Sequence, residues 1–217
     1  MTDFVKLRTM MVDTQVRPSD VTKFPIIEAM LTVARENFVP TAQRAAAYVG
    51  EHVSLGNGRV ALDPRVLAKM LDALNIQCDE LVLDIGTGLG YSSAVIARMA
   101  QAVIAVEENE TFAQDAASAL SDAGADNVVV ETAALTVGAP QHGPYDVVVL
   151  QGAVETIPAE ILSQVKEGGR ICAIFLDGPL GIARIGYKSN GNITWRLAFN
   201  ATAPVLPGFE ADRVFAL

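Results

Sequence analysis

The sequence predicts an α/β fold in which a doubly wound, Rossmann-like sheet, mostly parallel, carries helices on both faces. Apolar runs of strand length alternate with segments of helical periodicity over residues 81–175. A glycine-rich turn directly follows the first of these runs. A hairpin signal near the carboxyl end predicts an antiparallel edge on the same sheet.

Length and composition limit the classes of protein to consider. The chain has 217 residues, of which 51% are hydrophobic and 19% charged, which is typical of one globular α/β domain with an appendage. The net charge of −9 and the absence of a basic stripe argue against nucleic acid as a partner. No apolar run reaches the ~20 residues of a membrane span, and residues 1–11 lack the apolar core of a signal peptide. We therefore expect a cytoplasmic protein with no membrane partner.

Cysteines and histidines give no sign of a metal or redox site. Cys172 lies in the strand-like segment 170–175, where a thiol usually serves as a small core side chain. His52 and His142 are far apart and lack the spacing of metal ligands. We predict no metal site.

The first 45 residues are expected to form a helical cap. Phe4, Leu7 and Met11 recur at helical spacing within residues 3–40. Residues 17–20 (Arg-Pro-Ser-Asp) break this pattern, and Pro25 suits the first turn of a second helix. Residues 53–58 then predict a loop or short strand with a turn, before Asp63-Pro64 caps a third helix.

The remaining elements alternate along the chain. Strands are predicted at 81–85, 102–106, 127–131, 146–150 and 170–175, with helices at 91–100, 111–123 and 157–166. Segments 183–188 and 193–199 flank Ser189-Asn190-Gly191-Asn192, the hairpin signal. Since ligands of such sheets bind at the carboxyl ends of the strands, the expected site includes Asp84, the glycine turn, Glu107 and Gln151.

The glycine turn is the strongest functional signal. Gly86, Gly88 and Gly90 alternate between an apolar run and a helical segment, and glycine allows backbone to approach a ligand closely. The third glycine comes one residue too early for the dinucleotide fingerprint, which argues against a nicotinamide oxidoreductase. Asp84 suits a cationic amino-acid tail, and Glu107, roughly twenty residues on, suits ribose hydroxyls. S-adenosylmethionine has both groups, although a glycine-rich connection also occurs in parallel sheets without a ligand.

Five stretches of the chain resemble the protein-L-isoaspartate O-methyltransferase family. They are residues 33–40 (VARENFVP), 47–64, 84–91 (DIGTGLGY) with Val106-Glu107, 144–146 (PYD) and 168–170 (GGR). The glycine stretch alone is shared by many methyltransferases, so the N-terminal stretches carry the resemblance.

The resemblance implies a single methyltransferase domain over residues 1–217, with a substrate loop at 46–64 and a cofactor-binding core at 65–217. It implies S-adenosylmethionine as cofactor and methyl esterification of isoaspartyl carboxylates in damaged proteins or peptides. The implied cofactor-binding residues are Asp84, Gly86, Thr87, Gly88, Gly90, Tyr91, Glu107, Glu108, Ala134, Leu135 and Gln151. Gly56, Arg59 and Leu62 are expected to face the acceptor, and the sequence leaves the oligomeric state open.

The chain departs from the family where methyl transfer takes place. Val60 and Leu62 stand where the family has a threonine and a serine, so no catalytic residue is predicted. Asp63 replaces an amide, and Ala134 stands where the family has an acid near the adenine. Two alternatives therefore stay open: a member that binds S-adenosylmethionine or a partner protein without catalysis, and a methyltransferase with another acceptor.

Overall fold

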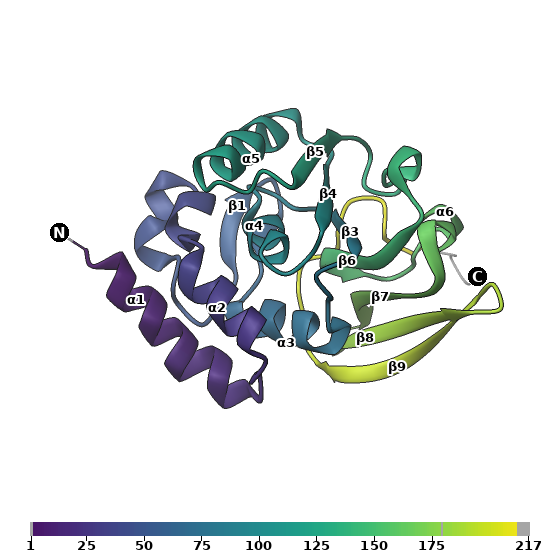
Figure 1. Ribbon diagram of the computed structural model, residues 1–217, viewed down its shortest axis with the longest axis horizontal. Helices are drawn as coiled ribbons and strands as arrows, with labels where there is room; N and C mark the ends of the chain where they lie inside the picture. The colour runs from purple at the N-terminus through teal and green to yellow at the C-terminus, as the bar shows by residue number, and fades with distance from the viewer. Residues whose placement is uncertain (1, 179, 212–217) are drawn as a thin grey trace, which may run out of the picture.

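The computed structural model describes residues 2–178 and 180–211, and its centre is a seven-stranded sheet in the order β5-β4-β3-β6-β7-β8-β9 (Figure 1). The strands are β3 (Leu81–Ile85), β4 (Ala102–Glu107), β5 (Val128–Thr132), β6 (Tyr145–Val154), β7 (Val165–Asp177), β8 (Leu180–Ser189) and β9 (Asn192–Asn200). Strands β5 to β7 pair in parallel through β4, β3 and β6, whereas β8 and β9 add antiparallel pairs at one edge. The predicted fold class is confirmed.

The parallel strands are buried on both faces, as their continuous apolar runs predict. Alternate side chains divide into two hydrophobic clusters: Val82 and Cys172 belong to one, Leu83 and Ile171 to the other. Cys172 is fully buried, and burial raises the pKa of its thiol to about 12. This thiol therefore stays protonated and packs as an apolar group.

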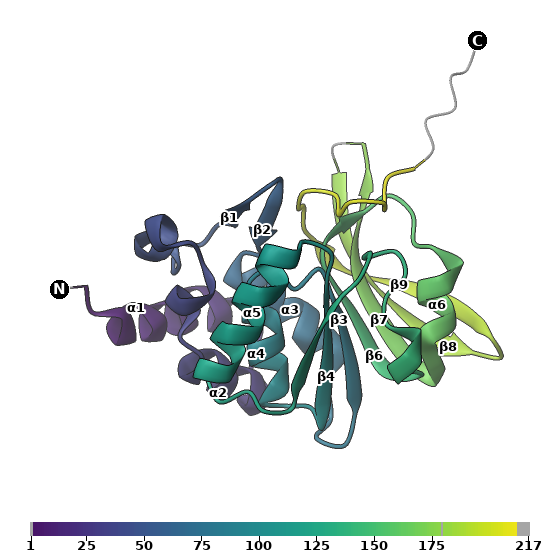
Figure 2. The ribbon, with the colours of Figure 1, turned by 90° about the horizontal axis from the view of Figure 1, so that it is seen from above.

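The helices cover the two faces unequally (Figure 2). Helices α3 (Pro64–Leu74), α4 (Tyr91–Ala97) and α5 (Glu110–Asp122) lie on one face, while α6 (Ala159–Gln164) lies on the other. The Asp63 side chain caps α3 by accepting a hydrogen bond of 2.8 Å from the Arg65 N–H, as the Asp63-Pro64 pair predicts.

The N-terminal cap packs outside the layer of α3 and α4. It consists of α1 (Phe4–Met11), a π-helical turn (Val12–Val16), a 3₁₀ turn (Arg17–Ser19) and α2 (Phe24–Thr32). Two further 3₁₀ turns follow, Arg35–Phe38 and Thr41–Ala46. The predicted break appears where Asp20 adopts a left-handed conformation, with φ of 65°.

A small second sheet lies at the carboxyl end of the parallel strands (Figure 2). It is the hairpin of β1 (Val53–Gly56) and β2 (Arg59–Ala61), and its turn contains Asn57 and Gly58 at φ of 53° and 74°. An L-residue rarely adopts these angles, which explains the Asn-Gly pair at this turn.

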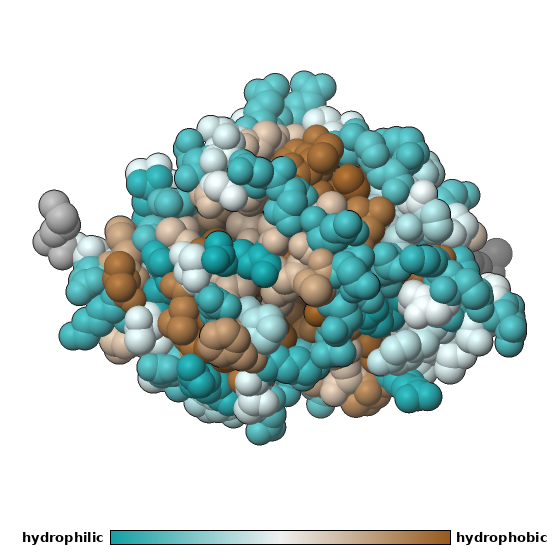
Figure 3. Space-filling view, in the orientation of Figure 1, coloured by the Kyte–Doolittle hydropathy of each residue, from teal (hydrophilic) through white to brown (hydrophobic). Residues whose placement is uncertain are grey.

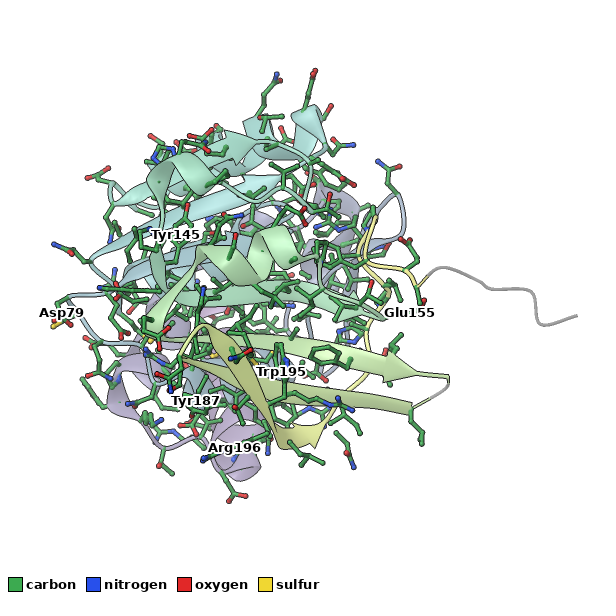
Figure 4. The ribbon with its side chains drawn as sticks, turned by 90° about the vertical axis from the view of Figure 1, so that its right-hand side faces the viewer. Asp79, Tyr145, Glu155, Tyr187, Trp195 and Arg196 are labelled. Carbon is green, nitrogen blue, oxygen red and sulfur yellow. The ribbon has the colours of Figure 1, made fainter. Side chains whose placement is uncertain are left out.

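The last hairpin and the segment that follows it complete one edge of the molecule (Figure 4). Asn190 and Gly191 form the predicted turn between β8 and β9, both with positive φ. Trp195 packs edge-on against Phe175 with ring centroids 4.8 Å apart, and the Arg196 guanidinium lies 5.6 Å from the centroid of the Tyr187 ring. These contacts are packing contacts of an edge hairpin.

Residues 201–211, the C-terminal strap, cross the carboxyl ends of the strands. The Ala153 N–H donates to the Pro204 carbonyl at 2.9 Å, and the Leu206 N–H donates to the Ala153 carbonyl at 2.8 Å. The Phe209 side chain is fully buried, and its carbonyl accepts from the Glu155 N–H at 2.8 Å. The strap is therefore held over the ends of the strands by both backbone and side chain.

Some boundaries differ from prediction for local reasons. Helix α4 ends at Ala97 rather than residue 100, because the Asn127 side chain donates to the carbonyls of Ala97 and Ala100 at 2.9 and 3.2 Å. Strand β7 begins at Val165, inside the predicted helix 157–166, with an irregular register before Arg170. Gly168 in that irregular stretch has φ of 80°.

The surface carries apolar patches among polar side chains on the face of Figure 3. Phe24, Val5 and Leu180 are the most exposed large apolar side chains described. Within residues 2–178 and 180–211, no helix has both the length and the apolar character that crossing a membrane requires.

Candidate functional site

The strand order reverses between β3 and β6, and the predicted site residues gather at this reversal. The glycine turn follows β3, Glu107 ends β4, and Gln151 lies in β6 next to the end of β3. Loops that leave neighbouring strands in opposite directions form a crevice at such a point. The structure thus brings together Asp84, the glycine turn, Glu107 and Gln151, from segments up to 67 residues apart.

The glycine turn needs glycine for both its conformation and its packing. Gly86, Gly88 and Gly90 have φ of 78°, 59° and 93°. The Val106 carbonyl accepts from the N–H groups of Gly86 and Thr87 at 2.8 and 3.3 Å, which ties the turn to β4. A Cβ at Gly90 would lie 3.2 Å from the Leu120 side chain, so the start of α4 packs tightly on α5.

Asp84 anchors the turn from below. Its carboxylate accepts from the hydroxyls of Ser92 and Ser93 at 2.6 and 2.5 Å and from the Gln151 amide at 2.7 Å. Burial raises the pKa of Asp84, while the hydrogen bonds from Ser92, Ser93 and Gln151 oppose that rise. Asp84 therefore fixes the position of α4 and of Gln151 relative to β3.

Glu107 is the most completely bonded carboxylate of the site, and it is fully buried. The Arg59 guanidinium binds it in a bidentate fashion, with Nη1 to Oε1 at 2.9 Å and Nη2 to Oε2 at 3.1 Å. The backbone N–H groups of Gly88 and Asn109 donate to the same two oxygens, at 2.8 Å to Oε2 and 3.1 Å to Oε1. Arg59 also donates to the Gly86 carbonyl at 2.7 Å.

The crevice is narrow because three side chains fill it. Arg59 and Leu55 enter from the β1–β2 hairpin, and Leu206 enters from the C-terminal strap. A Cβ on Gly86 would lie 2.8 Å from Arg59 Nη2, and one on Gly88 would lie 2.5 Å from Leu55. A Cβ on Gly152 would lie 2.7 Å from Leu206. Because these glycines have no Cβ atom, the three side chains can lie directly against the backbone.

A small cavity remains beside Tyr91. Its volume is about 20 Å³, and its lining includes Phe38, Val60, Leu62, Thr87, Tyr91 and Gln151. This volume holds about one water molecule. The lining is mainly apolar on the side of residues 60–62, which come from the predicted substrate loop.

Arg35 supports this wall from the cap, and its side chain is fully buried. Its guanidinium lies 4.5 Å from the centroid of the Tyr91 ring and donates to the carbonyls of Ala47 and Leu62, each at 2.7 Å. Among the described residues, the Tyr91 hydroxyl and Arg35 Nη1 have no hydrogen-bond partner. Burial lowers the pKa of Arg35, and the electrostatic interactions of its guanidinium with the Tyr91 phenol group and the Asp63 carboxylate oppose that change.

The other predicted residues lie at varied distances from the crevice. Thr87 and Leu62 line the cavity, and the Thr87 hydroxyl lies 2.7 Å from that of Ser93. Leu135 is fully buried in the hydrophobic core, whereas Glu108 and Ala134 are exposed. Gly56 is the exposed last residue of β1, and Arg59 reaches Glu107 rather than the cavity that Leu62 lines.

Sequence reasoning did not identify three of the site residues. Leu55 and Leu206 have the ordinary signature of core leucines, and only their tertiary positions bring them onto the glycine turn. Arg35 gave a detectable signal, because it is a charged residue between two apolar helical stretches. A charged side chain in such a place is rarely buried unless it has several partners.

Comparison with known proteins gives one consistent family. Residues 8–193 match the family described as protein-L-isoaspartate(D-aspartate) O-methyltransferase (PCMT). Protein-L-isoaspartate O-methyltransferase 2 of Syntrophobacter fumaroxidans is 36% identical over 160 residues, which are 74% of this chain and 64% of the relative. The chain thus spans slightly less than two thirds of that relative. Protein-L-isoaspartate O-methyltransferase 1 of the same organism is 34% identical over 79% of this chain and 80% of its own.

Solved structures share the fold. A protein-L-isoaspartate O-methyltransferase superposes with a TM-score of 0.80 at 22% identity, over 94% of this chain and 65% of its own. A putative protein-L-isoaspartate O-methyltransferase from Plasmodium falciparum, solved with S-adenosyl-L-homocysteine, has a TM-score of 0.80 at 17% identity, over 95% and 99% of the two chains. Together with the site geometry, the family match over residues 8–193 shows that this chain belongs to the protein-L-isoaspartate(D-aspartate) O-methyltransferase family.

Proposed function

We propose that this protein is an S-adenosylmethionine-dependent methyltransferase that esterifies the side-chain carboxylate of isoaspartyl residues in damaged proteins or peptides. The observation that carries the proposal is the juxtaposition of Glu107 with the glycine turn, where Glu107 Oε2 accepts from the Gly88 N–H at 2.8 Å. Membership of the family gives the reaction and the class of acceptor.

The residue types of the crevice fit S-adenosylmethionine. The two carboxylate oxygens of Glu107 suit the two ribose hydroxyls, and the turn at Gly86 and Gly88 leaves backbone uncovered by Cβ atoms. Gln151, held by Asp84, adds an amide beside the cavity. Ala134 gives no acceptor for an adenine amino group, so the hold at that end is weaker than in the family pattern.

When bound, the cofactor supplies an electrophilic methyl group on a sulfonium. The acceptor carboxylate is already ionised at neutral pH, so the chain needs no general base. Its residues contribute position and exclusion of water instead. Phe38, Val60 and Leu62 supply the apolar wall that excludes water beside Tyr91.

The direct test is transfer of labelled methyl groups from S-adenosylmethionine to an isoaspartyl peptide and to its normal aspartyl twin. We expect base-labile label on the isoaspartyl peptide and none above background on the twin. Equal labelling of both peptides would remove isoaspartyl specificity, and label on neither would contradict the proposed reaction.

Restoring the two hydroxyls should raise the transfer rate. Val60→Thr with Leu62→Ser adds donors to the cavity wall, and a hydrogen bond to a charged group contributes about 1.5–3 kcal/mol, or one to two powers of ten in rate. The single-turnover rate on the isoaspartyl peptide measures this. Val60→Ala with Leu62→Ala opens the same space without hydroxyls, and an equal gain in that control would show that space, not hydrogen bonding, limits the rate.

A second candidate function is binding of the cofactor or of a partner protein without methyl transfer. It is favoured by the apolar side chains at positions 60 and 62 and by the pairing of Arg59 with Glu107. Binding of S-adenosylhomocysteine with no methyl transfer from either the natural chain or the hydroxyl variant would support it over the first.

A further inference from the structure

The Glu107 carboxylate has no capacity left for a ligand in this conformation. Each of its oxygens accepts two hydrogen bonds, one from Arg59 and one from a backbone N–H. A carboxylate offers about four lone-pair sites, so all are used. A pair of ribose hydroxyls can bind Glu107 only if Arg59 leaves it.

Two leucines close the same crevice beside the ion pair. Leu55 lies where a side chain on Gly88 would be, at 2.5 Å from the ideal Cβ position, and Leu206 lies 3.1 Å from that of Gly86. The remaining cavity of about 20 Å³ compares with roughly 300 Å³ or more for ordinary small-molecule pockets. The described conformation therefore excludes a nucleoside by volume as well as by hydrogen bonding.

We infer that the β1–β2 hairpin is a self-inhibitory lid, and that Arg59 competes with the cofactor for Glu107. This inference rests on the proposed function and concerns the regulation of the same site. In the closed state the lid inserts Arg59 and Leu55 onto the glycine turn. The cofactor binds the open state, in which Arg59 has withdrawn into solvent and the Glu107 oxygens face the crevice.

The hairpin has the features of a segment that opens. Within the described residues, β1 and β2 pair with each other and with no strand of the larger sheet. A two-stranded hairpin is only marginally stable alone, so its side-chain contacts determine its position. Space is free around its tip, where Cβ atoms on Gly56 and Gly58 would meet nothing within 4 Å.

The exchange is also balanced in free energy. Burying an arginine and a carboxylate costs desolvation that their attraction only partly repays, so a buried ion pair can be replaced without large loss when both partners are satisfied. In the open state Arg59 regains water, and the ribose hydroxyls replace its hydrogen bonds to Glu107. Breaking this pair is therefore a reversible step rather than an unfolding step.

The test compares the dissociation constant of S-adenosylhomocysteine for the natural chain and for Arg59→Met, measured by titration calorimetry. Methionine keeps an unbranched apolar stem but has no N–H group to donate to the Glu107 carboxylate. If the open state is about 10% populated or less, removing the competitor tightens binding about tenfold or more. Leu206→Ala, which leaves the ion pair intact, should tighten binding by a smaller factor by uncovering Gly86 and Gly152.

Arg170→Met is the matched control for general loosening of the fold. Arg170 forms a similarly bidentate pair with Glu80, at 2.6 and 2.7 Å, at the amino end of the strands. Its loss should leave the dissociation constant within about twofold, since it touches no residue of the crevice.

The possible results separate this inference from the proposed function. Tighter binding by Arg59→Met, with Arg170→Met unchanged, supports the lid. If the natural chain binds S-adenosylhomocysteine and Arg59→Met binds it equally or more weakly, the lid is overturned but the cofactor proposal stands. No binding by any of the four chains at millimolar S-adenosylhomocysteine overturns both.

Discussion

Glu107→Ala is expected to lower the free energy of unfolding by about 1–3 kcal/mol and to abolish binding of S-adenosylhomocysteine. The substitution leaves the Arg59 guanidinium without its acid in a buried position, where its side chain is 6% exposed. It also removes the acceptor of the Gly88 and Asn109 N–H groups. Opening of the β1–β2 hairpin lets Arg59 reach water, so the expected loss is smaller than for an arginine that stays buried and unpaired.

Urea unfolding of a second variant separates two causes of lost stability, the unpaired Arg59 charge and the missing Glu107 side chain. In Arg59→Met with Glu107→Ala, no charge is left unpaired, so this double variant should be more stable than Glu107→Ala alone. Glu108→Ala is the control for stability, because Glu108 is the exposed neighbour and should change the free energy of unfolding by about 0.5 kcal/mol or less. A loss below about 1 kcal/mol for Glu107→Ala would contradict the assignment of a buried, ionised pair.

Arg35→Met is expected to lower the free energy of unfolding by about 2–4 kcal/mol. Arg35 is fully buried, and its two hydrogen bonds of 2.7 Å satisfy the carbonyls of Ala47 and Leu62. Methionine fills most of the volume but leaves both carbonyls unsatisfied and removes the contact with the Tyr91 ring. Relief of the desolvated guanidinium offsets part of this loss, which is why the expected value is below that of two full charged hydrogen bonds.

The midpoint of urea unfolding at constant m-value measures this change. Arg17→Met is the matched control, since Arg17 pairs with Asp13 on the surface, with the two side chains 53% and 55% exposed. Its loss should cost less than about 1 kcal/mol. Equal effects of the two substitutions would mean that Arg35 is not a structural centre of the cap.

Local patterns were sufficient to predict much of this fold. The Asp63-Pro64 pair marks the start of α3, Asn190-Gly191 marks the last hairpin, and the apolar runs mark the parallel strands. Each of these signals is contained within a few residues, so no knowledge of distant neighbours was needed. The grouping of Asp84, Glu107 and Gln151 followed from the rule that parallel strands end at the same edge.

That side chains of the same chain fill the crevice could not be predicted in the same way. Arg59 and Glu107 are 48 residues apart, and no periodicity connects them. Leu206 is held by hydrogen bonds of the strap to Ala153, which depend on where the chain returns after β9. Sequence patterns therefore predicted which polar groups the structure brings together in the candidate site, but not the side chains of the same chain that cover them.

The position of the strap near the carboxyl end determines the order in which this site is assembled during protein synthesis. Arg59, the glycine turn and Glu107 all precede Leu206, the last of them by about 100 residues, which corresponds to roughly 5–20 s of elongation at ~5–20 residues per second. During that interval the nascent chain contains the acid and the turn but not the leucine that covers them. Leu206 is therefore the last of these residues to be synthesised, after β6 has supplied Gln151.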